Sequence, residues 1–365
     1  MQLLQAQSEG AAEPNDLRAI YTQPPEQWPR ALVDEGVGPV EIGLLPEVAH
    51  SEGNEPTKAR VALGKQLFFD PRLSTSNQLA CASCHDPDLG WADGRTVSFG
   101  NQRTVLKRNA PTALYAGHWD SFFWDGRADS AEALVIAVIT NEDELRSTRD
   151  ELEAKFNAIP EYVASFHEAY GVERITMDDL AKAVAVFMRD NDEGNTPFDS
   201  FMKGRSEALT DQQVHGLHLF RTKARCMNCH HGPLFSDNDF HNTGLTLYGT
   251  DLQDLGRYEV TKDPADVGKF KTPTLRNIAN TKPYMHHGLF ESLEVTVSAY
   301  DGGMPEMRRR KGMEDDPLFP TKSPLMHELG LTADEKVALI AFMESLSERH
   351  RVRRAPQLPP DPPAE

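Results

Sequence analysis

Two short stretches of the chain have residue types that suit redox chemistry, and both share one spacing. The first begins at Cys81 and reads CASCHDPDLGWADG, and the second begins at Cys226 and reads CMNCHHGPLFSDND. Each separates two cysteines by two residues and places a histidine directly after the second cysteine. The chain has four cysteines, and these two motifs contain all of them. Whatever chemistry the thiols perform is therefore performed twice.

Three kinds of site use paired cysteines in this way. Four thiolates suffice for a zinc site, but zinc does not require a histidine after each pair. A thioredoxin-like dithiol is expected beside a βαβ pattern, and no strand-rich pattern is visible here. In a c-type haem, the cysteines form thioethers to the vinyl groups and the adjacent histidine becomes the proximal iron ligand. We therefore predict two covalent haem c groups, attached through Cys81, Cys84 and His85 and through Cys226, Cys229 and His230.

Each motif follows a segment with helical periodicity. TKARVALGKQLFFD has an apolar stripe at helical spacing, and LTDQQVHGLHLFRT opens with a capping-box pattern from Thr210 to Gln213. Both end in Gly-x-x-Leu-Phe. Later, ITMDDLAKAVAVFM from Ile175 and LTADEKVALIAFM from Leu331 repeat a second shared pattern. The fold class is therefore predicted to be mainly α, with two related cytochrome c-like helical domains in tandem.

The expected domain limits follow from composition. The polar stretch RDNDEGNTPFDS marks a boundary, which gives an N-terminal domain over residues 57–195 and a C-terminal domain over 196–350. Residues 1–56 are rich in Pro and Glu and predict an extended arm. Residues 351–365, which include APQLPPDPPAE, predict a flexible or polyproline-like tail.

Composition also excludes several classes of protein. The chain has 365 residues, 39% of them hydrophobic and 26% charged, as in soluble globular proteins, and it contains no apolar run long enough to span a membrane. A net charge of −18 argues against nucleic acid as a partner. The first residues lack the basic and apolar regions of an export signal. Because haem c is attached in the bacterial periplasm, we expect a periplasmic protein whose signal was removed.

Five stretches together resemble the bacterial di-haem cytochrome c peroxidase and MauG superfamily, over roughly residues 57 to 347. They are LFFDPRLSTSNQLACASCH, RNAPT, FFWDGRADS, CMNCHHGPLFSDNDFHNTG and TPTLRNIANTKPYMHHG. The resemblance implies an enzyme that reacts with H2O2. A MauG-like member oxidises a protein partner, whereas a conventional peroxidase takes electrons from a small cytochrome c or cupredoxin. A di-haem electron carrier is a third alternative, and both a monomer and a homodimer are compatible with the sequence.

The resemblance also bears on the ligand opposite His85. Conventional peroxidases carry a histidine before RN-x-PT that caps the N-terminal haem. The matching residue here is Asn101, and no histidine lies between His85 and His118. The N-terminal haem is therefore expected to be open to peroxide, with His118 as an alternative cap.

Opposite His230, conventional peroxidases carry a methionine. The matching residue in LEVTVSAYDGG is Tyr300, as in MauG. A phenolate is a hard anionic donor that stabilises oxidised iron, so this haem is expected to hold an oxidising equivalent. Met304 and Met307 are the alternative ligands if the register is shifted.

Two further positions concern the reaction itself. Trp124 in FFWDGRA resembles the tryptophan that lies between the haems, and is expected to relay electrons. A glutamate over the peroxidatic iron serves as acid and base in the family, and the match by register is Glu144, with Glu142 as the alternative. The glutamine that precedes it in the family is Leu134 here.

The resemblance further implies a calcium ion held by Asn109, Thr281 and Pro283. His231, His286 and His287 are expected to be surface histidines. Ala224 stands where MauG has a tryptophan, so the route to a protein partner is expected to differ. The sequence thus favours a MauG-like function over a conventional peroxidase.

Overall fold

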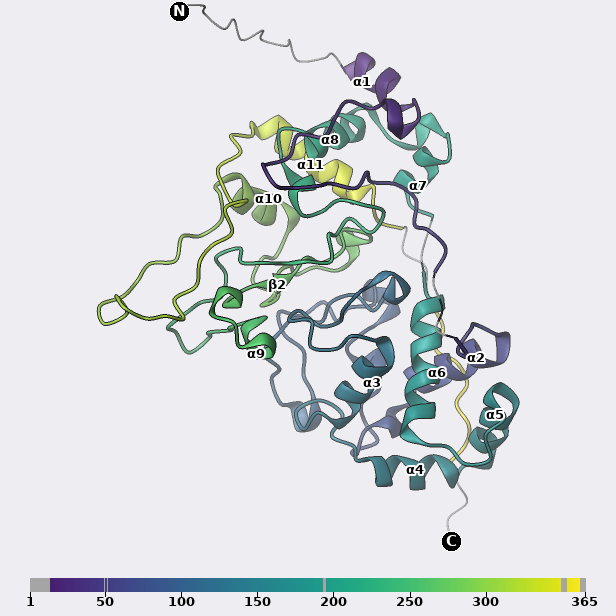
Figure 1. Cartoon of the computed structure of the whole chain (residues 1–365). Helices are drawn as coiled ribbons and strands as arrows, with labels where there is room; N and C mark the ends of the chain where they lie inside the picture. Colours follow the sequence, from purple (N-terminus) through teal and green to yellow (C-terminus); the bar gives the residue numbers. More distant parts are fainter. Residues whose placement is uncertain (1–13, 49, 51, 193–194, 349–352, 362–365) are drawn as a thin grey trace, which may run out of the picture.

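The computed structural model describes residues 14–48, 50, 52–192, 195–348 and 353–361. Figure 1 shows two helical halves, one containing α2 to α6 and the other α7, α8, α10 and α11. The helices are α1 (Pro14–Tyr21), α2 (Lys58–Phe68), α3 (Ala131–Thr140), α4 (Arg149–Asn157), α5 (Pro160–Tyr170), α6 (Met177–Asp190), α7 (Pro197–Met202), α8 (Asp211–Arg221), α9 (Tyr258–Thr261), α10 (Leu293–Asp301) and α11 (Ala333–Glu344). Two short strands, β1 (Phe240–His241) and β2 (Phe270–Lys271), pair antiparallel.

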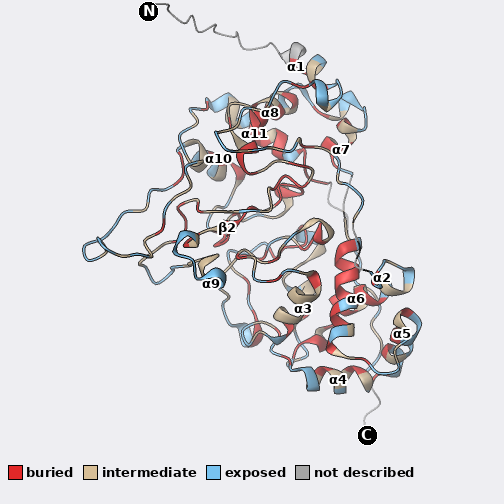
Figure 2. Ribbon diagram, in the orientation of Figure 1, coloured by how far each residue is buried: buried red, intermediate tan, exposed pale blue. Residues whose placement is uncertain are grey.

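The N-terminal domain is built around α6, which is buried along most of its length (Figure 2). Helices α2 and α3 pack against it, and Leu67 and Phe68 of α2 are fully buried in this core. A capping box fixes where α6 begins: Thr176 accepts the Asp179 N–H, and the Asp179 carboxylate accepts the Thr176 N–H. The sequence pattern therefore marked a real helix start.

The C-terminal domain repeats this arrangement, with α8 packed against α11. Thr210 and Gln213 form the capping box that begins α8. Thr332 and Glu335 form the one that begins α11. The chain is therefore mainly α with two tandem helical domains, as predicted.

One glycine in each domain lets its pair of helices approach closely. A Cβ atom on Gly64 of α2 would lie 1.9 Å from the carbonyl oxygen of Ala183 in α6. A Cβ atom on Gly216 of α8 would lie 2.0 Å from the carbonyl oxygen of Ala338 in α11. Only a residue without Cβ fits at these crossings, which explains why both helices share Gly-x-x-Leu-Phe.

A second repeated feature lies before α3 and α10. An antiparallel bridge joins the first and last residues of segment 122–128, and an equivalent bridge joins those of segment 284–290. Two residues later, Ser130 or Ser292 caps the following helix by accepting a backbone N–H. The two segments have the same length and lie at the same distance from their serines. A residue in one segment therefore has as its counterpart the residue at the same distance from the serine in the other.

The N-terminal segment differs from the predicted extended arm. Its described part, from residue 14 on, includes α1, which packs on α8. The C-terminal core includes four buried side chains from this segment, namely Leu17, Tyr21, Trp28 and Ile42. Arg221, 1% exposed in α8, donates to the Glu41 carboxylate and the Pro29 carbonyl. The apolar residues are too widely spaced among Pro and Glu to produce a periodic pattern, so composition alone predicted an arm.

The described part of the tail, residues 353–361, is also not free. The Arg72 side chain donates to the carbonyls of Pro359 and Pro360 and pairs with Asp361. The segment has no helix or strand, as its proline content predicts. Proline still offers a carbonyl acceptor, however, and a buried arginine needs acceptors. The described parts of the two terminal segments thus each pack on the domain that is farther away along the sequence.

The buried side chains form two clusters. One takes its residues from 63–188 together with Leu234, and the other from 17–42 and 198–346. The division lies between α6 and α7. Among the residues that the structure describes, no helix is both long and apolar enough to cross a bilayer.

We expect Gly64→Ala and Gly216→Ala each to lower the free energy of unfolding by about 1–3 kcal/mol, because the new methyl group overlaps a carbonyl oxygen of the facing helix. Chemical unfolding of the haem-loaded protein measures this change. Gly38→Ala is the matched control, since a Cβ there meets nothing within 4 Å. Equal unfolding midpoints for all three variants would mean that the helix crossings do not depend on glycine.

Candidate active site

The first cysteine motif lies on the 3₁₀ turn Cys81–Ser83, at an apolar cavity of about 90 Å³. The Nδ1 atom of His85, which lines the same cavity, lies 3.0 Å from the carbonyl oxygen of Trp91. A carbonyl oxygen can only accept, so Nδ1 carries the hydrogen and Nε2 keeps its lone pair. This tautomer, oriented by a backbone carbonyl, is the one that ligates a metal.

The second motif repeats this geometry on the 3₁₀ turn Cys226–Asn228. The Nδ1 atom of His230 lies 2.9 Å from the carbonyl oxygen of Phe235. Both cysteines and this histidine line a larger cavity of about 200 Å³. Each domain therefore presents two thiols and one imidazole with a free Nε2 at a cavity of its own.

The state of the cysteines distinguishes between the three kinds of site. All four are free, and burial raises the pKa of Cys81 to about 12 and that of Cys84 to about 11. Burial also raises the pKa values of Cys226 and Cys229. Without a bound group, burial therefore keeps all four as protonated thiols. The two pairs line separate cavities and do not converge on one ion. A thiol pair and an adjacent histidine at an apolar cavity fit a covalent haem in each domain.

Of the two candidate acids, Glu144 lines the N-terminal cavity, whereas Glu142 is exposed and does not. The Asn141 side chain donates a hydrogen bond of 2.8 Å to the Glu144 carboxylate. Burial raises the pKa of Glu144, and the nearby charge of Arg127 opposes that shift. Glu144 therefore holds a proton at a higher pH than an exposed glutamate does.

The remaining residues expected around this cavity are placed as follows. Leu134 lines it, where the family has a glutamine. Asn101 is buried and its N–H donates to the Asp143 carbonyl, but its side chain does not line the cavity. His118 pairs with Asp192 at 2.7 Å and lies outside the cavity, so it is not placed to cap an iron there.

Tyr300 of α10 lines the C-terminal cavity together with His230. Its hydroxyl has no hydrogen-bond partner within the described ranges of the chain. Burial raises the pKa of Tyr300, so the phenolate forms only if a cation such as iron stabilises it. Met304 and Met307 do not line the cavity, but three methionines that sequence reasoning missed do, namely Met285, Met326 and Met343.

The N-terminal counterpart of Tyr300 is Val138. Each is the eighth residue after the serine that caps its helix, Ser130 before α3 and Ser292 before α10. Val138 lines the N-terminal cavity as Tyr300 lines the C-terminal one. Because valine cannot ligate a metal, this cavity has no ligand at the position where the other has a phenol. Aligning the two repeats in the sequence could have shown this difference.

Trp124 belongs to the N-terminal domain but lines the C-terminal cavity. Its Nε1–H donates to the Asn109 carbonyl at 2.9 Å. Its ring meets that of His286 edge-on, with 6.3 Å between the centroids. His286 is the counterpart of Trp124 in the second loop, so the two equivalent loops meet at the domain interface.

The prediction of surface histidines is wrong for two of the three residues. His286 and His287 are 4% and 9% exposed, while His231 is half-buried. His286 stacks on Phe270 with 3.5 Å between ring centroids, and burial lowers the pKa of His286 to about 3. The reason is their position: both histidines lie in the loop that packs between the domains.

The three candidate calcium ligands, Asn109, Thr281 and Pro283, all line the C-terminal cavity beside Trp124. The amide nitrogen of Asn109 donates to the Arg95 carbonyl at 2.7 Å, so its amide oxygen is the atom available to a cation. One side-chain oxygen and two backbone carbonyls suit calcium.

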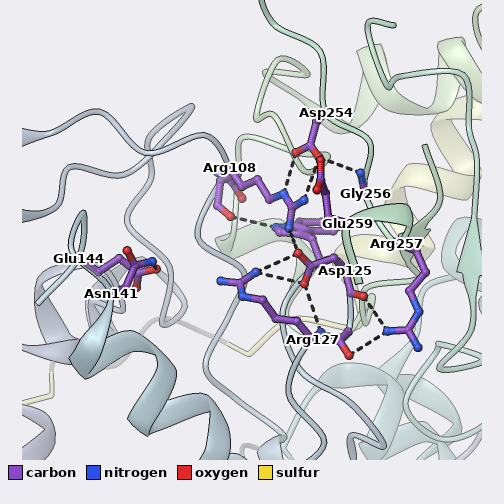
Figure 3. A network of polar contacts seen from close by, with 12 residues as sticks. Arg108, Asp125, Arg127, Asn141, Glu144, Asp254, Gly256, Arg257 and Glu259 are labelled. Atoms are coloured by element: carbon purple, nitrogen blue, oxygen red, sulfur yellow. Dashed lines mark hydrogen bonds and ion pairs between the residues drawn. The ribbon is translucent and has the colours of Figure 1, made fainter. Parts of the chain in front are cut away.

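An ion-pair network that sequence reasoning missed crosses the domain interface (Figure 3). Arg108 pairs with Asp125 at 2.6 Å and with Asp254 of the C-terminal domain at 2.7 Å. Arg127 pairs with the same Asp125 at 3.1 Å, on the side of the network that faces Glu144 in Figure 3. The motifs RNAPT and FFWDGRADS contain three of these residues, but charge in a motif does not reveal its distant partner.

Comparison with known proteins agrees with this arrangement. A family model described as "Di-haem cytochrome c peroxidase" matches residues 58–207. The cytochrome-c peroxidase IdrP1 of Pseudomonas sp. strain SCT is 35% identical, over 84% of this chain and 85% of that protein. The methylamine utilization protein MauG of Methylorubrum extorquens is 37% identical, over 86% of this chain and 85% of that protein.

A solved structure is also similar. It is that of a MauG-like protein associated with microbial copper homeostasis, with 30% identity and a TM-score of 0.75. The match covers 83% of this chain and 93% of that one. The motifs, the repeated helical domains and these relatives agree, and the chain belongs to the di-haem cytochrome c peroxidase family of peroxide-dependent enzymes.

Proposed function

We propose that this enzyme reacts with H2O2 in its N-terminal domain and uses the oxidising equivalents to oxidise a protein partner, in the manner of MauG. The observation that carries the proposal is the difference between Val138 and Tyr300 at equivalent positions. His85 would hold the iron of a haem in the N-terminal cavity, where Val138 offers no ligand atom and so would leave the metal open to peroxide. His230 would hold the second iron in a cavity where Tyr300 offers a phenol, whose anion would stabilise the oxidised metal.

A c-type haem, when bound, supplies an iron that exchanges electrons with peroxide and stores oxidising equivalents. Glu144 supplies the proton transfer: its carboxylate takes a proton from H2O2 and returns it to the departing oxygen. The hydrogen bond from Asn141 holds one carboxylate oxygen in place, which leaves the other for the peroxide proton. The largely apolar lining keeps other proton donors away from this exchange.

Trp124 is the proposed route for electrons between the two domains. It extends from an N-terminal loop into the C-terminal cavity, and the bond from its Nε1–H to the Asn109 carbonyl holds the indole there. An indole can lose an electron transiently and recover it, so it can relay oxidising equivalents without being consumed. The next two residues of the Asn109 segment, Ala110 and Pro111, line the same cavity.

The second candidate function is that of a conventional peroxidase, which reduces H2O2 with electrons from a small cytochrome c or cupredoxin. Met326 at the C-terminal cavity favours it, because a methionine ligand raises the haem potential and suits electron intake. Tyr300 favours the MauG-like function for the opposite reason. A di-haem electron carrier would not need the open position that Val138 leaves.

Several further features belong to the proposal. Asn109, Thr281 and Pro283 bind calcium between the domains. Haem c attachment assigns the protein to the periplasm. Ala224 lines the C-terminal cavity where MauG has a tryptophan, so electrons leave toward the protein partner by a different route, and the partner differs as well.

Replacing Cys226 and Cys229 together by serine should abolish covalent haem in the C-terminal domain and leave one haem in the N-terminal domain. A denaturing gel stained for haem, with mass spectrometry of the intact chain, measures how many haems remain attached. The same double change at Cys81 and Cys84 is the matched control and should spare the other haem. Loss of all haem from wild type under denaturing conditions would contradict covalent attachment.

Glu144→Gln keeps the size of the side chain but removes the base, so the rate of reaction with H2O2 should fall by roughly 10²- to 10⁴-fold. Stopped-flow absorption of the haem bands measures this rate. Burial raises the pKa of Glu144, so its base form is lost at a higher pH than for an exposed glutamate. The wild-type rate should therefore decline as the pH is lowered, and Glu144→Gln should lack that decline. Glu142→Gln is the matched control, and a larger loss in this variant would transfer the role to Glu142.

Tyr300→Met should raise the reduction potential of the C-terminal haem, because methionine replaces an anionic oxygen donor. The oxidised protein formed with H2O2 should then decay faster, while the rate of its formation at the N-terminal haem stays unchanged. Spectroelectrochemical titration and near-infrared absorption measure the two effects. Tyr284→Phe is the control: this tyrosine lines the same cavity, but its hydroxyl donates to the Ile278 carbonyl. An unchanged potential in Tyr300→Met would show that Tyr300 only packs in the cavity.

A further inference from the structure

Lys271 is a buried lysine at the domain interface that has no part in the proposed reaction. It is 6% exposed, and its Nζ donates to the Ser121 carbonyl at 2.5 Å. The same ammonium lies 3.6 Å from the centre of the Trp119 ring. Its backbone N–H donates to the Trp124 carbonyl. The side chain is thus enclosed by the loop that presents Trp124 to the C-terminal cavity.

Lys271 has a counterpart in the N-terminal domain, Asn109. The Asn109 N–H donates to the His286 carbonyl at 2.8 Å, as the Lys271 N–H donates to the Trp124 carbonyl at 2.8 Å. Trp124 and His286 are equivalent residues of the two bridged loops, so their partners are equivalent as well. The sequence agrees: Asn109 begins Asn-Ala-Pro-Thr and Lys271 begins Lys-Thr-Pro-Thr.

The same correspondence holds for the residues around the lysine. The two bridged loops begin at equivalent residues, Phe122 and Tyr284. Trp119 and Thr281 each lie three positions before these residues, and Ser121 and Pro283 each lie one position before them, so the members of each pair are counterparts. The ammonium of Lys271 contacts the carbonyl of Ser121 and the ring of Trp119. Lys271 therefore meets the counterparts of the two backbone residues in the candidate calcium site.

We propose that Lys271 is a built-in cation, which fills the position in one half of the interface that corresponds to the calcium site in the other half. On the side of Asn109, the amide nitrogen donates to the Arg95 carbonyl, which leaves the amide oxygen for a free cation. On the side of Lys271, the side chain supplies the positive charge itself. This inference goes beyond the proposed function, because it concerns a second cation position that the peroxide reaction does not require.

Burial opposes the charged form of Lys271, and the groups around the amine act against burial. Burial lowers the pKa of Lys271 to about 7, and the carboxylates of Asp120 and Asp237 act in the opposite direction. The Ser121 carbonyl and the face of the Trp119 ring both favour the protonated amine. If the lysine is replaced by a shorter side chain with an oxygen donor, the same carbonyl and carboxylates suit a divalent cation.

The test is to replace Lys271 by the residue that its counterpart carries. After dialysis of the haem-loaded protein against calcium, Lys271→Asn should hold one more calcium per chain than wild type, as counted by elemental mass spectrometry. The matched control is Lys269→Asn. Lys269 lies on the same segment, is a third exposed and pairs with Asp266 at 3.0 Å, so removing it should leave the calcium count unchanged.

Thermal unfolding provides the second measurement. Lys271→Asn should unfold at a lower temperature than wild type without calcium and regain stability when calcium is added. Lys271→Met offers neither charge nor oxygen and should be destabilised without recovery, whereas Lys271→Arg should match wild type. Equal calcium counts in wild type, Lys271→Asn and Lys269→Asn, or no recovery of Lys271→Asn by calcium, would overturn the proposal. A wild type that holds no calcium would also overturn the proposal, because Lys271 would then correspond to no cation position, whereas the proposed reaction with peroxide would be unaffected.

Discussion

Two backbone hydrogen bonds determine how the domains meet. The Asn109 N–H donates to the His286 carbonyl and the Lys271 N–H donates to the Trp124 carbonyl, so each domain contributes one donor and one acceptor. Such a bond contributes only about 1 kcal/mol on balance. A buried donor that loses its partner, however, costs about 1–3 kcal/mol, which penalises any other register between the loops. This exchange places a tryptophan of one domain in the cavity of the other, and the proposed path for electrons depends on it.

The ion pairs around Arg108 reinforce this register. Arg108 holds a carboxylate from each domain, Asp125 and Asp254, and all three side chains are less than one fifth exposed. Removing one member of a buried pair costs about 3–5 kcal/mol, because the other charge is left without a partner. Because its ion pairs join the two domains, the network mainly fixes how the domains are oriented relative to each other, and it adds less to the stability of either domain alone. The same aspartate also pairs with Arg127, whose charge acts on Glu144, so Asp125 connects the interface with the proposed acid–base residue.

Local signals in the sequence predicted much of the fold. The capping boxes at Thr176, Thr210 and Thr332 mark real helix starts, and the cysteine motifs occupy equivalent turns in two equivalent domains. What sequence reasoning missed depends on contacts between distant segments. His286 is buried because its loop faces that of Trp124, and the N-terminal segment is ordered because Arg221 reaches Glu41. No periodicity within either segment contains that information. Val138 could have been predicted from the sequence, but only by aligning the two repeats, which places it opposite Tyr300.

The position of the Lys271 ammonium has a consequence for the two tryptophans of its loop. Removing an electron from an indole leaves a positive charge on the ring, and a neighbouring cation repels that charge. Burial lowers the pKa of Lys271 to about 7, and while the amine is protonated the repulsion at about 4 Å and an effective dielectric constant of about 20 amounts to about 4 kcal/mol. Trp119 has the ammonium against its face, whereas Trp124 meets a neutral imidazole. Two indoles five positions apart thus differ in how readily they are oxidised, and the more readily oxidised one is the indole that reaches the second cavity.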